Sequence, residues 1–142
     1  IEQLFVDLNV TPTITKVGTL AHYHAPQLDI FVGDIFNVTR ELLGPVDAVY
    51  DRAALVALPP QMRARYTAHL ASLTAQAPQL LISFEYDQHA MEGPPFSVTT
   101  AEIHQHYGPR YDITVLASLD VPGGLKGRCP ATERVYVLRK GR

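Results

Sequence analysis

The chain has 142 residues, of which 46% are hydrophobic and 18% are charged. It is therefore long enough for one domain with a real core, and it is not a disordered polymer. Twelve basic and fourteen acidic residues give a formal net charge of -2, and neither sign forms a long block. This argues against a nucleic-acid groove and a polybasic membrane patch, and it favours a small molecule as the partner.

Cysteine content and hydropathy bear on the cellular compartment. The single cysteine, Cys129, cannot form an internal disulfide, which suits a reducing cytosol. No apolar run approaches the roughly 20 residues needed to span a bilayer, and the first residues lack the features of a signal peptide. We therefore expect a cytoplasmic protein without a membrane partner.

The first 32 residues predict one helix and three strands. A helical apolar face with i, i+3, i+4 and i+7 spacing begins at Ile1 without a preceding N-cap residue, so we expect a helix cut in its middle. Residues 13–17 and 21–25 alternate as two short strands, which predicts a peripheral hairpin. Residues 28–32 form a denser apolar strand that ends on Gly33-Asp34.

A strand followed by a charged pair is the leading candidate for a site. Gly44 and Pro45 end a short helix, and residues 46–55 then read as an apolar strand that stops on Asp51 and Arg52. In an open α/β sheet, ligands bind where strands end and turn into helices. We therefore expect Arg52 to lie at a site, whereas Asp51 has the simpler interpretation of a turn acid or ion-pair partner.

The next segments continue the alternation of helix and strand. A helix is predicted from Pro60 to about Ala77, because Met62, Tyr66, Leu70 and Leu73 form one apolar stripe. Residues 79–84 form a near-continuous apolar run, which is typical of a strand covered on both faces. That strand ends on the polar exit Glu85-Tyr86-Asp87.

The last third of the chain predicts a rigid loop, a helix and two strands. The two prolines of residues 92–98 restrict the backbone, and Thr99 with Glu102 forms a capping-box pattern that opens a short helix ending at Gly108. Residues 111–121 and 133–140 alternate as an antiparallel pair at a sheet margin. The whole pattern predicts an α/β layered sheet.

Four other groups of residues have side chains that could form a site. His22 and His24 would share a strand face, but no third ligand is apparent, so no metal site is predicted. His104 and His106 point in different directions on a helix. Glu85 and Asp87 lack the opposing geometry of a glycosidase pair, and Cys129 is expected to be a quiet structural thiol.

The residues resemble one known family. The motifs Phe31 to Phe36, Tyr50-Asp51-Arg52-Ala53-Ala54-Leu55, Phe84 to Asp87, Glu92-Gly93-Pro94-Pro95-Phe96-Ser97-Val98 and Val135 to Leu138, together with Tyr66, are similar to those of the thiopurine S-methyltransferase family. The resemblance runs nearly end to end. It implies transfer of a methyl group from S-adenosylmethionine (SAM) to the sulfur of a small-molecule thiol, on a Rossmann-like class I methyltransferase fold.

The resemblance also implies roles for five residues. Asp34 and Ile35 match the positions that contact the adenine of the cofactor, and Arg52 matches an arginine beside both cofactor and substrate. Arg52 is therefore the candidate catalytic residue as well as a cofactor and substrate contact, since its charged fork suits an anionic sulfur. Pro94 and Pro95 match the loop that walls the substrate pocket.

One departure from the family concerns the cofactor cradle. The glycine-rich turn after the first strand and the ribose-binding acid after the second are not found in this sequence. The family's strand order of 3-2-1-4-5-7-6 would place those two strands between residues 28–32 and 46–55. We therefore expect a single domain over residues 1–142 that forms the C-terminal part of a longer three-layer sandwich, and we expect this chain alone to bind SAM weakly or not at all.

The function stays open within and beyond this family. The alternatives are a catalytically silent α/β remnant or interaction module, and a related methyltransferase for thiocyanate, halides, or selenium and tellurium species. The Glu92 to Phe96 loop favours the thiopurine branch. The complete protein is expected to be a monomer.

Overall fold

The computed structural model describes residues 1–141 and has an α/β fold with two separate sheets. The chain divides into two compact units, residues 1–42 and the part that begins at Leu43, and each is described by itself. No helix in the described part is long and apolar enough to cross a membrane. The expectation of a single domain stays a prediction.

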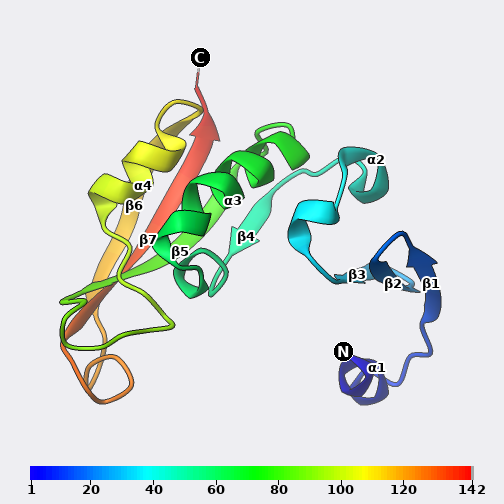
Figure 1. The fold of residues 1–142 in the computed structure, drawn as a ribbon, viewed down its shortest axis with the longest axis horizontal. Helices are drawn as coiled ribbons and strands as arrows, with labels where there is room; N and C mark the ends of the chain where they lie inside the picture. Colours follow the sequence, from blue (N-terminus) through cyan, green and yellow to red (C-terminus); the bar gives the residue numbers. More distant parts are fainter. Residues whose placement is uncertain (142) are drawn as a thin grey trace. The chain divides into compact units, whose positions relative to one another are not determined.

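The first unit is a three-stranded antiparallel sheet with a short helix. Its elements are α1 (Glu2–Asp7), β1 (Thr13–Val17), β2 (Leu20–Ala25), β3 (Leu28–Val32) and the 3-10 helix η1 (Ile35–Asn37), followed by α2 (Arg40–Leu43), which runs across the boundary between the units. The sheet order is β1-β2-β3 (Figure 1). The predicted hairpin is confirmed, and β3 extends it as a third strand because residues 28–32 pair with β2.

Helix α1 forms as predicted, but most side chains of its predicted apolar face are exposed. Phe5 is 2% exposed and stacks on Tyr23 of β2 with ring centroids 5.8 Å apart. Ile1, Leu4 and Leu8 on the predicted face are all exposed. The helix therefore rests on the sheet through one aromatic contact.

The second unit holds a mixed sheet covered by two helices. Its elements are β4 (Val49–Asp51), the 3-10 helix η2 (Leu55–Ala57), α3 (Pro60–Leu73), β5 (Gln79–Tyr86), α4 (Thr100–Tyr107), β6 (Tyr111–Asp120) and β7 (Ala131–Lys140). The strand order is β4-β5-β7-β6, with β4 parallel to β5 and the other pairs antiparallel. Figure 1 shows α3 and α4 on the same face of this sheet.

The core of the second unit lies between the sheet and these helices. Leu81, Tyr136 and Leu138 from the strands and Ile103 and Tyr107 from α4 have no exposed surface. Strand β5 alternates between buried residues on this face and half-buried residues on the other. The expectation that residues 79–84 are fully covered on both faces is therefore wrong within the described residues, because both helices pack on one side.

Two further expectations need correction. The strand predicted within residues 46–55 ends at Asp51 as expected, but it begins only at Val49, so β4 is three residues long and is followed by η2. Helix α3 ends at Leu73, and Met62 of the predicted apolar stripe is 37% exposed while Tyr66, Leu70 and Leu73 are buried. The antiparallel pair near the C-terminus is confirmed as β6 and β7.

Candidate functional site

The candidate site lies at the carboxyl ends of the parallel strands β4 and β5. The register pairs Tyr86 at the end of β5 with Ala131 at the start of β7, and Asp120 at the end of β6 with Thr132. One sheet edge therefore carries three loops, formed by residues 52–59, 87–99 and 121–130. Crevices at such an edge are where open α/β sheets bind ligands.

Asp51 fixes the first of these loops. Its side chain is 3% exposed. Its Oδ2 atom accepts a hydrogen bond from the Tyr66 hydroxyl at 2.8 Å, and Oδ1 accepts from the backbone N–H groups of Ala54 and Leu55 at 3.3 Å each. Burial, together with the Asp51 charge, raises the pKa of Tyr66, so Tyr66 stays a neutral donor. Asp51 is thus a buried turn acid, and no ion pair to it is found in residues 1–141.

Arg52 is the first residue of the turn whose backbone N–H groups donate to Asp51. It is exposed, and the described residues provide no hydrogen bond or ion pair to its guanidinium. The next residue, Ala53, has a φ of 72°, a left-handed conformation that costs an L-residue free energy. The turn therefore leaves the guanidinium of Arg52 in solvent, directly after the buried carboxylate of Asp51.

The proline loop lies against the same turn. The Phe96 N–H donates to the Val56 carbonyl at 2.6 Å, and the Tyr86 hydroxyl donates to the Pro95 carbonyl, also at 2.6 Å. The Lys126 ammonium donates to the Pro94 carbonyl at 2.7 Å. The structure thus brings the loop of Pro94 and Pro95 against the segment that follows Arg52.

A buried arginine ties this region together, and sequence analysis missed it. Arg63 of α3 is 2% exposed; its Nε donates to the Leu58 carbonyl at 3.0 Å, and its Nη1 donates to both carboxylate oxygens of Glu102 at 2.9 and 3.1 Å. Its guanidinium also lies 5.4 Å from the ring centroid of Phe96. Its spacing of three residues from Tyr66 is the sequence signal that places Arg63, and not Met62, on the buried face of α3.

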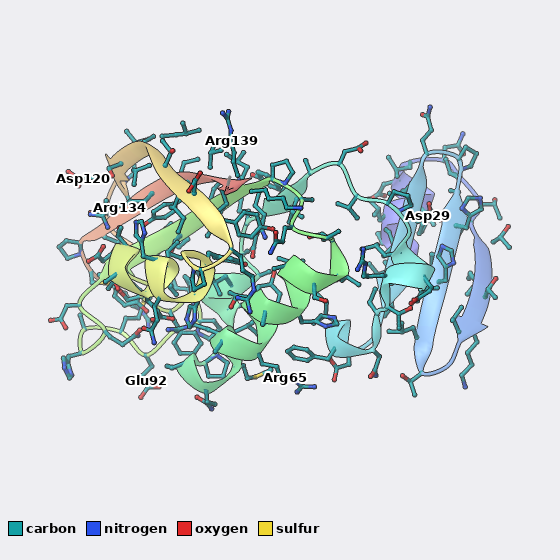
Figure 2. All side chains as sticks on the ribbon, turned by 90° about the horizontal axis from the view of Figure 1, so that it is seen from above. Asp29, Arg65, Glu92, Asp120, Arg134 and Arg139 are labelled. Carbon is teal, nitrogen blue, oxygen red and sulfur yellow. The ribbon has the colours of Figure 1, made fainter. Side chains whose placement is uncertain are left out.

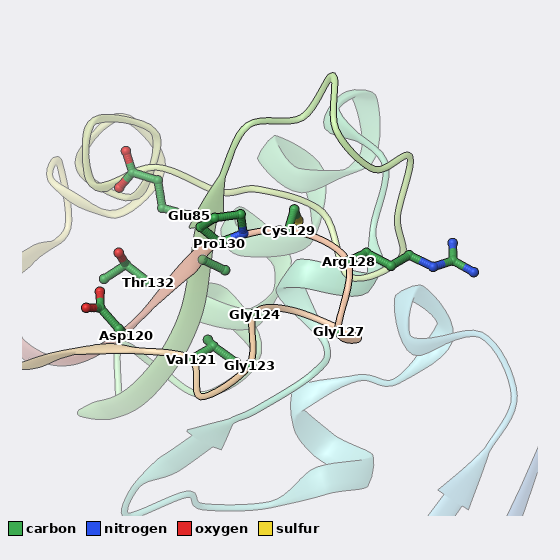
Figure 3. A pocket seen from close by; sticks show the side chains of 11 residues that line it. Glu85, Asp120, Val121, Gly123, Gly124, Gly127, Arg128, Cys129, Pro130 and Thr132 are labelled. Atoms are coloured by element: carbon green, nitrogen blue, oxygen red, sulfur yellow. The ribbon is translucent and has the colours of Figure 1, made fainter.

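A cavity of about 480 Å³ opens at the same sheet edge (Figure 3). None of the predicted site residues lines it. Its lining comes from the strand ends and the 121–130 loop: Glu85, Asp120, Val121, Gly123, Gly124, Gly127, Arg128, Cys129, Pro130, Ala131 and Thr132. Cys129 is 4% exposed and packs in an apolar cluster with Tyr86 and Met91, which fits the expected structural thiol. Glu85 is ion-paired with Arg134.

Asp34 and Ile35 lie in the first unit. Asp34 is the N-cap of η1, where its Oδ1 accepts a hydrogen bond from the Phe36 N–H at 2.9 Å. Its side chain is exposed, and the adjacent Ile35 is 38% exposed. These two neighbouring residues belong to the first unit, whereas Arg52 belongs to the second.

Comparison with known proteins identifies the family. A family model described as "Thiopurine S-methyltransferase (TPMT)" matches residues 1–141. Proteins named thiopurine S-methyltransferase are similar to the chain in Xanthobacter autotrophicus (54% identical over 140 residues, 99% of this chain and 66% of the relative) and Gluconobacter oxydans (50% over 136 residues, 96% and 62%). A third, from Teredinibacter turnerae, is 46% identical over 140 residues, 99% of this chain and 65% of the relative.

The chain thus spans slightly less than two thirds of the length of these relatives. The match nevertheless covers the described chain from end to end. It includes both the turn that carries Arg52 and the loop that carries Pro94 and Pro95. The chain belongs to the thiopurine S-methyltransferase family.

Proposed function

We propose that the complete gene product transfers a methyl group from SAM to the sulfur of a small aromatic or heterocyclic thiol of the thiopurine type. The observation that carries the proposal is the exposed Arg52 at the start of a turn that the buried Asp51 fixes, in a segment that bonds to the loop of Pro94 and Pro95 through Val56 and Phe96. The family membership and the printed names of the relatives support it.

The sheet topology supports a Rossmann-like class I sandwich for the complete protein. The order β4-β5-β7-β6 corresponds to the 4-5-7-6 half of the family's sheet. Within residues 1–141, β3 pairs only with β2 and β4 pairs only with β5, so each leaves one edge with unpaired backbone groups. Our proposal places two further strands between those edges and a second helical layer over the half-buried face of β5.

Asp34 and Ile35 fit an adenine ring by their chemistry. The hydrogen bond from the Phe36 N–H orients the Asp34 carboxylate, which can accept a hydrogen bond from an exocyclic amino group. The exposed aliphatic side chain of Ile35 can pack against the ring. When bound, SAM supplies an activated methyl group on a positively charged sulfonium. This chain's part is to orient the adenine end through these two residues.

Arg52 acts on the thiol substrate in this proposal. A guanidinium is charged at all physiological pH values and donates hydrogen bonds in a planar fork, so it favours the thiolate over the thiol. An aromatic thiol is acidic enough to ionise near neutral pH, so its proton can pass to solvent and no dedicated base is required. Holding the sulfur in line with the methyl group can supply on the order of 7 to 11 kcal/mol of the barrier reduction.

The test compares Arg52→Met with the unaltered complete gene product. Methionine keeps an unbranched side chain but removes the charge, so kcat/KM for an aromatic thiol should fall about 10- to 100-fold, the loss expected for one charge-assisted hydrogen bond. SAM affinity, measured by calorimetry, should change by less than the turnover does. Unchanged turnover of the thiol would exclude the role of Arg52.

The control and the substrate panel separate the alternatives. Arg139→Met removes an exposed arginine near the far end of β7 (Figure 2) and should leave turnover unaltered. Thiocyanate, iodide, selenite and tellurite are assayed beside aromatic thiols. Preference for one of the four inorganic substrates would assign the protein to the related branch of methyltransferases. Absence of methyl transfer to every substrate, the aromatic thiols included, would favour a silent remnant. The expected small-molecule partner and monomeric state stay predictions.

A further inference from the structure

Two histidines and an aspartate converge on one face of the β1-β2-β3 sheet. His22 and His24 alternate on β2 and therefore share a face, and the antiparallel register pairs His24 with Asp29 of β3. The sequence offered no third ligand beside the two histidines, because Asp29 reaches them only through this strand pairing. Figure 2 labels Asp29 on the small sheet.

The three ligand atoms are already close together. The Oδ1 atom of Asp29 lies 2.8 Å from Nε2 of His22 and 2.7 Å from Nδ1 of His24, and all three atoms lie within 4.8 Å of one another. Around a tetrahedral ion with bonds of about 2.0 Å, ligand atoms are separated by about 3.3 Å. To hold an ion, the two Asp29–histidine distances would lengthen by about half an ångström, and the two imidazole nitrogens, which lie no more than 4.8 Å apart, would take up the same spacing.

The surroundings of the cluster favour a preformed site with open positions. The ring of His22 stacks on Phe31, with centroids 4.4 Å apart, which restricts the orientation of the imidazole. Helix α1 packs on the opposite face of the sheet, since Phe5 contacts Tyr23 and not the histidines. His24 and Asp29 have side-chain exposures of 59% and 49%, so solvent ligands can complete the coordination.

The chemistry of the cluster selects one class of ion. Imidazole nitrogens bind zinc, copper, iron and nickel, whereas magnesium and calcium prefer sites made of oxygen ligands. A carboxylate supplies negative charge that compensates a divalent ion, and Asp29 provides it between the two imidazoles.

We propose that His22 Nε2, His24 Nδ1 and Asp29 Oδ1 form a binding site for a divalent transition-metal ion of the zinc class. The site is independent of the methyl-transfer proposal, because it uses none of the residues assigned there. A bound ion links β2 to β3. It takes the place of the protons in the two hydrogen bonds between the histidines and Asp29.

Titration of the metal-free 142-residue chain with Zn²⁺ by calorimetry tests the site. We expect one ion per chain with a dissociation constant in the micromolar range or below. His22→Ala, His24→Ala and Asp29→Ala should each weaken binding at least tenfold. His104→Ala removes an exposed histidine on α4 and should bind as the unaltered chain does. Unchanged affinity in the three cluster variants, or millimolar affinity of the unaltered chain, would refute the site.

A second measurement needs no variant. Titrated Co²⁺ should first perturb the imidazole NMR resonances of His22 and His24 and should give the visible absorption of a coordinated ion. The other four of the six histidines serve as internal controls. Equal perturbation of all six, or first effects at histidines outside the cluster, would mean adventitious surface binding and would overturn the proposal.

Discussion

At the scale of single residues, the candidate site rests on a buried carboxylate beside an exposed cation. Asp51 and Arg52 are adjacent in the sequence, yet the first is 3% exposed and the second points to solvent. Three hydrogen bonds reach the Asp51 carboxylate, two of them from the backbone of the turn that follows. Asp51 therefore sets the conformation from which Arg52 projects.

Removal of the Tyr66 hydroxyl tests this anchor. Tyr66→Phe leaves Oδ2 of Asp51 buried without its 2.8 Å donor, and the loss of a hydrogen bond to a charged group should lower the free energy of unfolding by about 1.5–3 kcal/mol. Urea denaturation at pH 7 measures the effect. Tyr50→Phe, at a residue that is 62% exposed, should change stability by less than about 0.5 kcal/mol. Equal effects of the two substitutions would contradict the anchoring role.

The same variant should alter the response to alkaline pH. Burial beside Asp51 raises the pKa of Tyr66 above its usual value of 10.0. A raised pKa in the folded state stabilises the protein below the unfolded-state pKa, and that stabilisation is lost as the pH rises above about 10. The unaltered chain should therefore lose stability above that pH more steeply than Tyr66→Phe does.

At the scale of elements, Arg63 connects α3 to α4 and to the proline loop. Its guanidinium donates to Glu102 at the start of α4 and lies over Phe96. Glu102 is also 2.9 Å from His106 one turn later. A buried guanidinium with this many contacts positions the loop that walls the candidate site, in addition to holding two helices together.

Arg63→Met should destabilise the second unit by roughly 2–4 kcal/mol, since it breaks a buried ion pair while keeping the apolar part of the side chain. Thermal or urea unfolding measures the loss. Arg139→Met, at an exposed position of β7, should cost less than about 0.5 kcal/mol. A double-mutant cycle with Glu102→Gln should give a coupling energy of about 0.5–3 kcal/mol; additive effects would show that the pair does not contribute.

At the scale of the whole molecule, the described chain presents open sheet edges and a half-covered sheet face. Tyr50 is 62% exposed and lies in register with the half-buried Leu80 and Val137, on the face opposite α3 and α4. The proposal made above covers these surfaces with further strands and helices of the complete protein, and it leaves Asp34 and Ile35 to supply only part of a cofactor cradle.

The 142-residue chain alone should therefore bind SAM weakly or not at all. Calorimetric titration of this chain, beside the complete gene product under the same buffer conditions, makes the comparison. We expect measurable binding only for the complete protein, because the described residues include no glycine-rich turn or ribose-binding acid of the kind that the family uses. Micromolar binding by the 142-residue chain would contradict the expectation.

The sequence by itself determined the family and most of the elements. Local patterns located the hairpin of β1 and β2, helix α3, strand β5, the capped helix α4 and the antiparallel pair β6 and β7, because hydrophobic periodicity and turn residues act over a few neighbouring positions. The motifs around Arg52 and the two prolines also identified two segments that the fold places in contact.

Only the tertiary structure decided which distant residues meet. The bonds of Asp51 to Tyr66 and of Arg63 to Glu102, and the meeting of His24 with Asp29, join segments whose pairing depends on strand register and helix packing. The role of the Asp51 carboxylate was also beyond the sequence pattern, because it accepts from the N–H groups of Ala54 and Leu55 and so fixes the turn after β4. Long-range contacts of this kind follow from packing, which local periodicity does not encode.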